Sequence, residues 1–178
     1  MSSLQYVPMS YDQWQQLPEK PKAEWVDGVA VIGVPPVFDH GYVQTALSVA
    51  LITAFPSLRV VTEVFVVLPH NRVRIPDISV VDHRPEGGMI TDPPVLVVEV
   101  LSPSTRGEDT IRKSTEYAGA GIGQYWIVDP DLRSLDIYRN VDGGWEPLAR
   151  LDDHSPTATV EVEHHGTVDL DLATLLDG

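Results

Sequence analysis

Two carboxylate residues lie inside apolar segments of this sequence and could take part in chemistry. Glu99 interrupts the valine-rich run from Val95 to Leu101, which is short enough to be a fully buried strand. Asp77 follows a proline and begins a second expected strand, Asp77 to Val81. A charged carboxylate in such a strand is costly unless a cation or hydrogen-bond donors meet it. We therefore expect a partner for each acid.

The two acids can point at one spot if their strands are neighbours. Side chains alternate between the faces of a strand, so Asp77 shares a face with Ser79, and Glu99 shares one with Val97. Two carboxylates that lie close together repel each other unless a cation sits between them. Mg²⁺ usually takes one or two carboxylates together with waters and a substrate phosphate. The pair therefore predicts a site for a hard divalent cation.

Three further residues could complete this site. Lys113 lies in the helix expected after the Glu99 strand, with Tyr117 one turn on and on the same face. Its ammonium group could orient a water or offset charge that builds on a phosphate. Glu24, at the start of an expected hairpin, is a candidate that could equally be solvated at a strand end. His40, at the start of an expected helix, could act in the site or only hydrogen-bond at the helix start.

The other candidates also have interpretations without catalysis. Asp77 could be a turn residue that begins its strand, and Glu99 could be a buried acid paired with a buried base. Lys113 could form a surface ion pair with Asp109, which lies four residues before it. The pair His164-His165 could bind a metal, but it also fits an exposed polar pair.

The expected elements alternate between strands and helices along the whole chain. Helices are expected at 11–16, at 40–54 and from 105 to about 119–123, with N-terminal caps at Ser10, Asp39 and Thr105. Strands are expected at 59–68, 72–75, 77–81, 95–101, 125–128, 135–139, 145–150 and 157–162, with a short segment at 170–176. Residues 24–34 are expected to form a hairpin that turns at Asp27-Gly28. This pattern predicts an α/β (α+β) fold in which helices flank a mixed sheet.

The composition limits the class of protein. The 178 residues are 43% hydrophobic, which is enough for one ordered domain, 1–178, with a substantial core. The absence of cysteine excludes disulfides and thiol catalysis and suits a reducing cytoplasm. No apolar run reaches the roughly 18 residues of a membrane span, and the N-terminus lacks a secretory-signal pattern. The net charge of −14 argues against non-specific nucleic-acid binding, but allows a local basic patch or a cation-filled acidic site.

Several motifs in the chain are similar to those of a known family. The segments EWVDG, FDHGYV, RIPDISVVD and VLVVEVLSPSTRGEDTIRKSTEYAGAGIGQYWIVDPD resemble the Uma family of putative restriction endonucleases, within the PD-(D/E)XK nuclease superfamily. The similarity runs from about Glu24 to about Arg150, which would be the core of the domain. It implies a restriction-endonuclease-like core and a Mg²⁺-dependent phosphodiester hydrolase.

The resemblance assigns roles to individual residues. Asp77 matches the motif Asp and Glu99 the motif Glu, and together they would hold Mg²⁺ or Mn²⁺ with the main-chain carbonyl of Leu101 or Val100. The superfamily places a Lys two residues after the Glu, where this chain has Leu101. In the Uma family the Lys appears in the following helix, and Lys113 occupies that place.

The resemblance also implies binding partners, and it leaves two other functions open. Glu24 and His40 match recurrent family positions. The implied substrate is nucleic acid, DNA rather than RNA, with no membrane partner, and restriction-like nucleases often act as homodimers. A first alternative is a nuclease-fold protein that no longer cuts and works through protein or nucleic-acid contacts, which the net charge of −14 favours. A second is a metal-dependent hydrolase of another phosphate ester.

Overall fold

A six-stranded sheet forms the centre of the molecule. The computed structural model describes residues 4–18, 20–33, 36–102 and 107–177, with only the main chain at 108–110. The central sheet has the order β11-β10-β9-β8-β7-β4. Its strands are β4 (Arg59–Thr62), β7 (Ile78–Val81), β8 (Leu96–Val100), β9 (Gln124–Asp129), β10 (Ser134–Val141) and β11 (Gly144–Leu151). β8 and β9 run parallel and the other neighbours antiparallel, so the sheet is mixed, as the sequence predicts.

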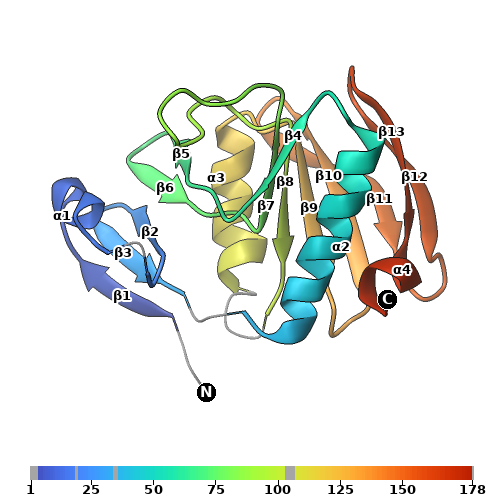
Figure 1. Cartoon of the computed structure of the whole chain (residues 1–178), viewed down its shortest axis with the longest axis horizontal. Coiled ribbons are helices and arrows are strands. Elements are labelled where there is room, and N and C mark those ends of the chain that lie inside the picture. The colour runs from blue at the N-terminus through green and yellow to red at the C-terminus, as the bar shows by residue number, and fades with distance from the viewer. Residues whose placement is uncertain (1–3, 19, 34–35, 103–106, 178) are drawn as a thin grey trace.

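Helices cover both faces of this sheet (Figure 1). Helix α2 (Phe38–Ala54) packs against one face through Val43, Leu47 and Leu51, which join a buried cluster with residues of β7 and β8. The hairpin of β12 (Thr157–Val162) and β13 (Gly166–Asp171), with α4 (Leu172–Leu176), continues that cover. The opposite face carries the π-helical segment η1 (Glu108–Lys113) and α3 (Ser114–Gly119). This arrangement confirms the predicted fold class, a mixed sheet flanked by helices.

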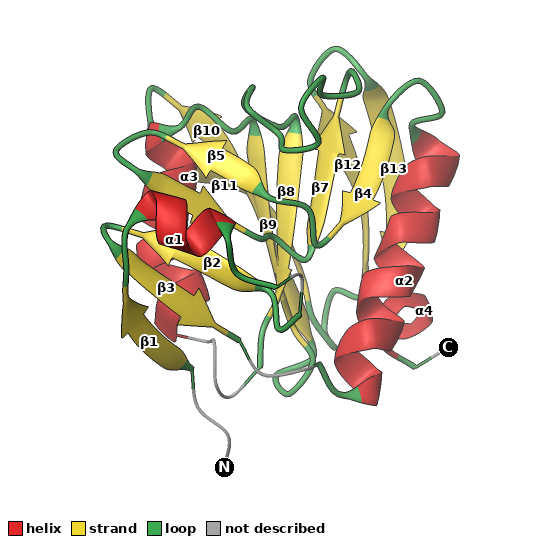
Figure 2. Ribbon diagram, turned by 60° about the vertical axis from the view of Figure 1, so that its left-hand side comes forward, coloured by secondary structure: helices red, strands yellow, loops and turns green. Residues whose placement is uncertain are grey.

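A second sheet lies beside α3, as Figure 2 shows. Its order is β1-β3-β2-β6-β5. Its strands are β1 (Gln5–Pro8), β2 (Ala23–Val26), β3 (Val29–Ile32), β5 (Val66–Leu68) and β6 (Arg72–Arg74). The helix α1 (Tyr11–Gln15) packs on it through Trp14, which contacts the rings of Tyr11 and Phe65. This sheet therefore has an aromatic core of its own.

The predicted turn between β2 and β3 is present. Asp27 and Gly28 both have positive φ angles, 50° and 85°, as a tight two-residue hairpin turn requires. Among the described residues, no helix combines the length and the apolar character that a membrane crossing requires.

Some expected boundaries are wrong. The expected strand 59–68 is two strands, β4 and β5, that belong to different sheets. The chain leaves the central sheet at Glu63, whose φ of 52° breaks the extended conformation. Helix α2 begins at Phe38 with Val37 as its N-cap, so Asp39 lies in the first turn rather than at the cap. The expected cap at Thr105 lies outside the described residues.

Two strand pairings were not predicted from the sequence. β1 pairs with β3, although all four of its residues are exposed and show no alternation between apolar and polar. β13 pairs with β12 and lies mostly before the expected short segment 170–176, most of which is the helix α4.

Gly123 lets the start of β9 approach the start of β8. A Cβ at this position would lie 2.6 Å from the carbonyl oxygen of Val95, which also accepts a hydrogen bond from the Gln124 N–H at 3.0 Å. We expect Gly123→Ala to lower the free energy of unfolding by about 2 kcal/mol or more, since the backbone has to shift. Urea unfolding measures this change. Gly119→Ala is the matched control, because a Cβ at Gly119 meets nothing within 4 Å. Equal stability of the two variants would contradict the close approach.

Candidate active site

The two predicted acids come from neighbouring strands of the central sheet. The antiparallel register pairs Ile78 with Val98 and Ser79 with Val97. Asp77, one residue before β7, therefore lies across from Glu99 in β8. The two strands are neighbours, as the sequence predicts, and both acids lie at the same end of them.

Glu99 is buried and paired with a buried base. Its side chain is 3% exposed, and both of its carboxylate oxygens lie 3.1 Å from Nζ of Lys113. The hydroxyl of Tyr117 donates to Oε1 of Glu99 at 2.6 Å. Burial and the negative charge of Glu99 raise the pKa of Tyr117 well above its ordinary value, so the phenol stays a donor. The prediction that a cation and hydrogen-bond donors meet this acid is confirmed.

Asp77 is held by α2 and by β8. Its Oδ2 accepts a hydrogen bond from the main-chain N–H of Val100 at 2.6 Å. Its Oδ1 lies 3.0 Å from Nε2 of His40, in the first turn of α2. One turn further along α2, Gln44 donates to the main-chain oxygen of Asp77 at 2.7 Å. The packing of α2 therefore places His40 on Asp77, at a partly exposed edge of the site.

Lys113 also contacts Glu24, the candidate from the second sheet. Its Nζ lies 3.2 Å from Oε1 of Glu24, and both side chains are buried. Neither a solvated Glu24 nor a surface Lys113 fits this geometry, so those two interpretations are wrong. The side chain of Asp109 lies outside the described part of the chain. Burial alone would raise the pKa of Glu24, but the positive charges of Lys113 and Arg74 outweigh burial and hold that pKa below its ordinary value.

Arg74 is a central residue of the site that was not predicted from the sequence. Its side chain is fully buried and donates through two nitrogens to Glu116 at 2.6 and 3.0 Å, and through Nη1 to Glu24 at 2.8 Å. These charge-assisted hydrogen bonds raise the pKa of Arg74 despite its burial. The residue types of Arg72, Val73 and Arg74 give no sign that one of these arginines is buried. For Glu116 a signal existed, because it lies three residues after Lys113 on the same helix face.

The charge network continues from Glu116 to the protein surface. Nε of Arg72 and Nε of Arg112 lie 3.5 and 3.3 Å from Oε1 of Glu116. Both arginines also reach Asp27 at the turn of the first hairpin, at 3.2 and 3.4 Å. Among the described side chains, the network has four acids and four Lys or Arg cations: Glu24, Asp27, Glu99 and Glu116 with Arg72, Arg74, Arg112 and Lys113.

The possible metal ligands are oxygen atoms of two acids. In the described part of the chain no three His, Asp or Glu side chains lie close enough together to hold a metal. Asp77 and Glu99, the two predicted carboxylate ligands, lie at facing positions of β7 and β8. The amide of Leu101, the third predicted ligand residue, donates to the Val128 carbonyl at 2.8 Å at the end of β8. His164 instead lies exposed near Glu163 in the turn between β12 and β13.

Comparison with known structures identifies the class of fold. A crystal structure of a putative nuclease of the DUF820 family, from Anabaena variabilis, superposes on this chain with a TM-score of 0.73. The two chains are 24% identical, and the superposition covers 95% of this chain and 98% of the other. The fold is therefore shared with that protein.

Comparison with family sequences identifies the family. Residues 8–173 match the Uma2 family of putative restriction endonucleases. This match spans most of the chain, and the protein belongs to the Uma2 family. A search of curated proteins gives no match.

Removal of the Arg74 charge would leave two buried acids without their shared partner. We expect Arg74→Met to lower the free energy of unfolding by about 3–5 kcal/mol, the usual cost of breaking a buried ion pair from one side. Denaturant unfolding at neutral pH measures this loss. Arg139→Met removes an exposed arginine that pairs with Glu146 at 2.9 Å, and it should change stability by less than about 1 kcal/mol. Similar losses in the two variants would refute the central role of Arg74.

The lowered pKa of Glu24 makes stability depend on pH in a defined direction. The carboxylate stabilises the fold fully above its ordinary pKa of 4.5, and this stabilisation is lost as the pH falls through the lower pKa of the folded state. Glu24→Gln removes this contribution. We therefore expect the stability difference between wild type and Glu24→Gln to be largest near pH 7 and to shrink below about pH 4.5. Thermal melts across this range measure it, with the exposed Glu146→Gln variant as control. A difference that does not change with pH would contradict the prediction.

Proposed function

We propose that this protein is a Mg²⁺- or Mn²⁺-dependent endonuclease that hydrolyses phosphodiester bonds of nucleic acid, with DNA as the favoured substrate. The observation that carries the proposal is the buried Lys113 ammonium, held by Glu99 at the strand end where Asp77 also lies. Membership of the Uma2 family and the shared nuclease fold support it.

The donor set suits a hard divalent cation. Asp77 and Glu99 supply carboxylate oxygens from facing positions, and Mg²⁺ takes one or two carboxylates with waters and phosphate oxygens as its remaining ligands. Among the described residues, Asp77 has no Lys or Arg within ion-pair distance, so its negative charge favours an added cation. A divalent cation, when bound, would polarise the phosphoryl group and make a water more acidic.

The protein's own residues would orient the reacting groups. Glu99 and Glu24 fix Nζ of Lys113 between them, so the ammonium is in place before substrate arrives. From there it can offset the negative charge that builds on a phosphate, or hold the attacking water. His40 restrains one oxygen of Asp77, and Tyr117 restrains one oxygen of Glu99. Water-excluding packing around Glu99 strengthens each of these interactions.

A second candidate function is a nuclease-fold protein that binds its partner without cutting it. The net charge of −14 favours this candidate, because an acidic surface repels nucleic acid. The position of the lysine also favours it, since Leu101 stands two residues after Glu99 and Lys113 is already engaged by two carboxylates.

Substitution of the site residues separates the two candidates. We expect the wild type to cut plasmid DNA or single-stranded oligonucleotides in Mg²⁺ or Mn²⁺, and Asp77→Asn, Glu99→Gln and Lys113→Met each to lower the rate at least about 100-fold. Gel electrophoresis of the products measures the rate, and circular dichroism confirms that each variant is folded. Arg139→Gln is a surface control that should cut normally. Cleavage that persists in Asp77→Asn or Glu99→Gln would show that the assignment is wrong.

Calorimetric titration with Mn²⁺ gives a second, independent measurement. We expect the wild type to bind the metal and Asp77→Asn to bind it much more weakly, because a hard cation loses a charged ligand. A wild type that neither binds Mn²⁺ nor cuts would support the non-cutting candidate.

A further inference from the structure

Two arginines stand apart from the dense ion pairing of this acidic protein. Apart from Lys20, every other described Lys and Arg side chain has a carboxylate within ion-pair distance. Arg59 and Arg84 have no such carboxylate among the described residues, although the chain carries 26 Asp and Glu. Since no described carboxylate pairs with them, the planar guanidinium groups of these two arginines are available to an anionic ligand.

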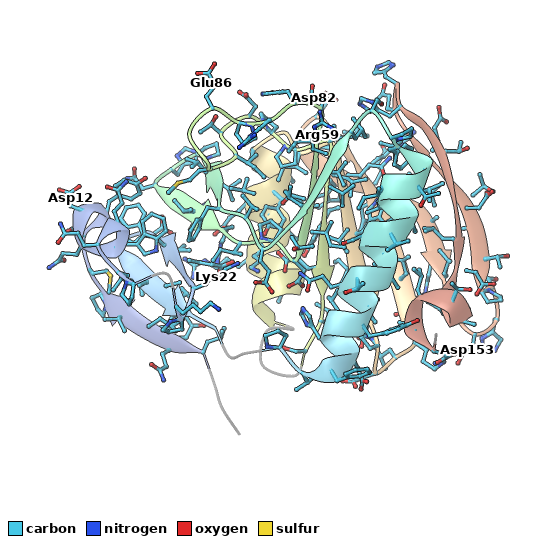
Figure 3. All side chains as sticks on the ribbon, in the orientation of Figure 1. Asp12, Lys22, Arg59, Asp82, Glu86 and Asp153 are labelled. Atoms are coloured by element: carbon cyan, nitrogen blue, oxygen red, sulfur yellow. The ribbon has the colours of Figure 1, made fainter. Side chains whose placement is uncertain are left out.

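Both arginines line one hollow at the edge of the central sheet. The hollow has a volume of about 520 Å³, which is in the range of small-ligand sites. Its remaining lining is mainly apolar and consists of Val61, Val64, Val81, Pro85, Gly88 and Ile90. Figure 3 shows Arg59 at the upper edge of the molecule, near the loop that carries Asp82 and Glu86. The hollow thus combines an apolar surface with two positive charges.

Two acids of the adjoining loop, Asp82 and Asp92, pair with a histidine of that loop rather than with Arg59 or Arg84. Asp82 contacts Nδ1 of His83, and Asp92 lies 3.1 Å from Nε2 of the same ring. These contacts raise the pKa of His83, which favours its protonated form as the partner of both acids. The histidine therefore satisfies Asp82 and Asp92, and among the described residues neither these acids nor Glu86 lies within ion-pair distance of Arg84.

The hollow lies on the same face of the sheet as Glu99. Val81 is paired with Arg59 across β4 and β7, and it shares a face with Ser79, which pairs with Val97. Glu99 is two residues beyond Val97 on that face. The hollow is therefore four residues from the acids along the strands, or about 13 Å. The buried residues Ser79 and Val97 fill that face in between, so a nucleic-acid strand with its scissile phosphate at the acids would follow the partly exposed edge strand β4 to place a nucleotide in the hollow.

We propose that this hollow binds one unpaired nucleotide of the substrate, with a phosphate on Arg59 and Arg84 and the base on the apolar lining. The proposal rests on the proposed nuclease function and narrows its substrate to single-stranded or flapped nucleic acid. Bases of an intact duplex are stacked and paired, and would have to be extruded at a cost before one could enter the hollow. Apolar and stacking contacts form with any base. The site would therefore distinguish single-stranded from double-stranded nucleic acid, and not one base sequence from another.

Binding of a short fluorescein-labelled oligo-dT strand tests the site without cleavage, because the titration is done in EDTA. We expect the double variant Arg59→Gln/Arg84→Gln to bind about tenfold more weakly than wild type, since charge-assisted contacts to phosphate are lost. The slope of log K against log salt should fall by about 0.7 for each phosphate contact removed. Lys20→Gln is the matched control, since it removes an exposed charge that lies outside the hollow and has no carboxylate within ion-pair distance among the described residues, and it should bind within about twofold of wild type.

A second variant fills the hollow with the opposite charge. Val64→Glu places a carboxylate in the lining and should weaken oligo-dT binding to a similar extent. Unchanged affinity and salt slope in both variants would overturn the proposal, and so would equal wild-type affinity for the single strand and for a blunt duplex. The nuclease proposal fails separately: if wild type binds oligo-dT through the arginines but cuts nothing in Mn²⁺, the nucleotide site stands and the catalytic assignment falls.

Discussion

One ammonium group shared between two buried carboxylates is the interaction on which the rest of this site depends. Removing charges from water costs several kcal/mol per ion, so Glu99, Glu24 and Lys113 are tolerable in the interior only together. Glu99 belongs to the central sheet, Glu24 to the second sheet and Lys113 to the helical layer between them. The requirement that these charges meet therefore specifies how the layers are placed relative to one another.

Arg74 extends the same constraint to the helix α3. Its planar guanidinium group reaches Glu116 through two nitrogens and Glu24 through a third, a geometry that lysine cannot reproduce. Glu24 is thereby held from two sides, by Arg74 and by Lys113. A site built in this way is rigid before any ligand arrives, which is the condition for electrostatic stabilisation of a developing charge.

The sequence predicted the parts of this arrangement that follow a simple pattern. An acid inside a valine-rich strand needs a partner, and this reasoning led to Glu99 and to Lys113 one helix later. It could not predict Arg74, because an arginine in an alternating strand usually faces solvent, and only the packing of α3 against the second sheet, to which β6 belongs, buries it. The break between β4 and β5 could not be predicted from the sequence either. Residues 59–68 are mostly apolar, and nothing in the residue types shows that the backbone turns at Glu63.

The order of residues along the chain has a consequence for protein synthesis. The ribosome produces Glu24, Asp77 and Glu99 before Lys113, and the ion pair between Arg74 and Glu116 joins residues 42 positions apart. A nascent chain that ends before η1 holds Glu99 without Lys113, so it cannot bury this acid with its counter-ion. The site can therefore assemble only after the helical segment has left the exit tunnel, and a prematurely terminated translation product lacks it.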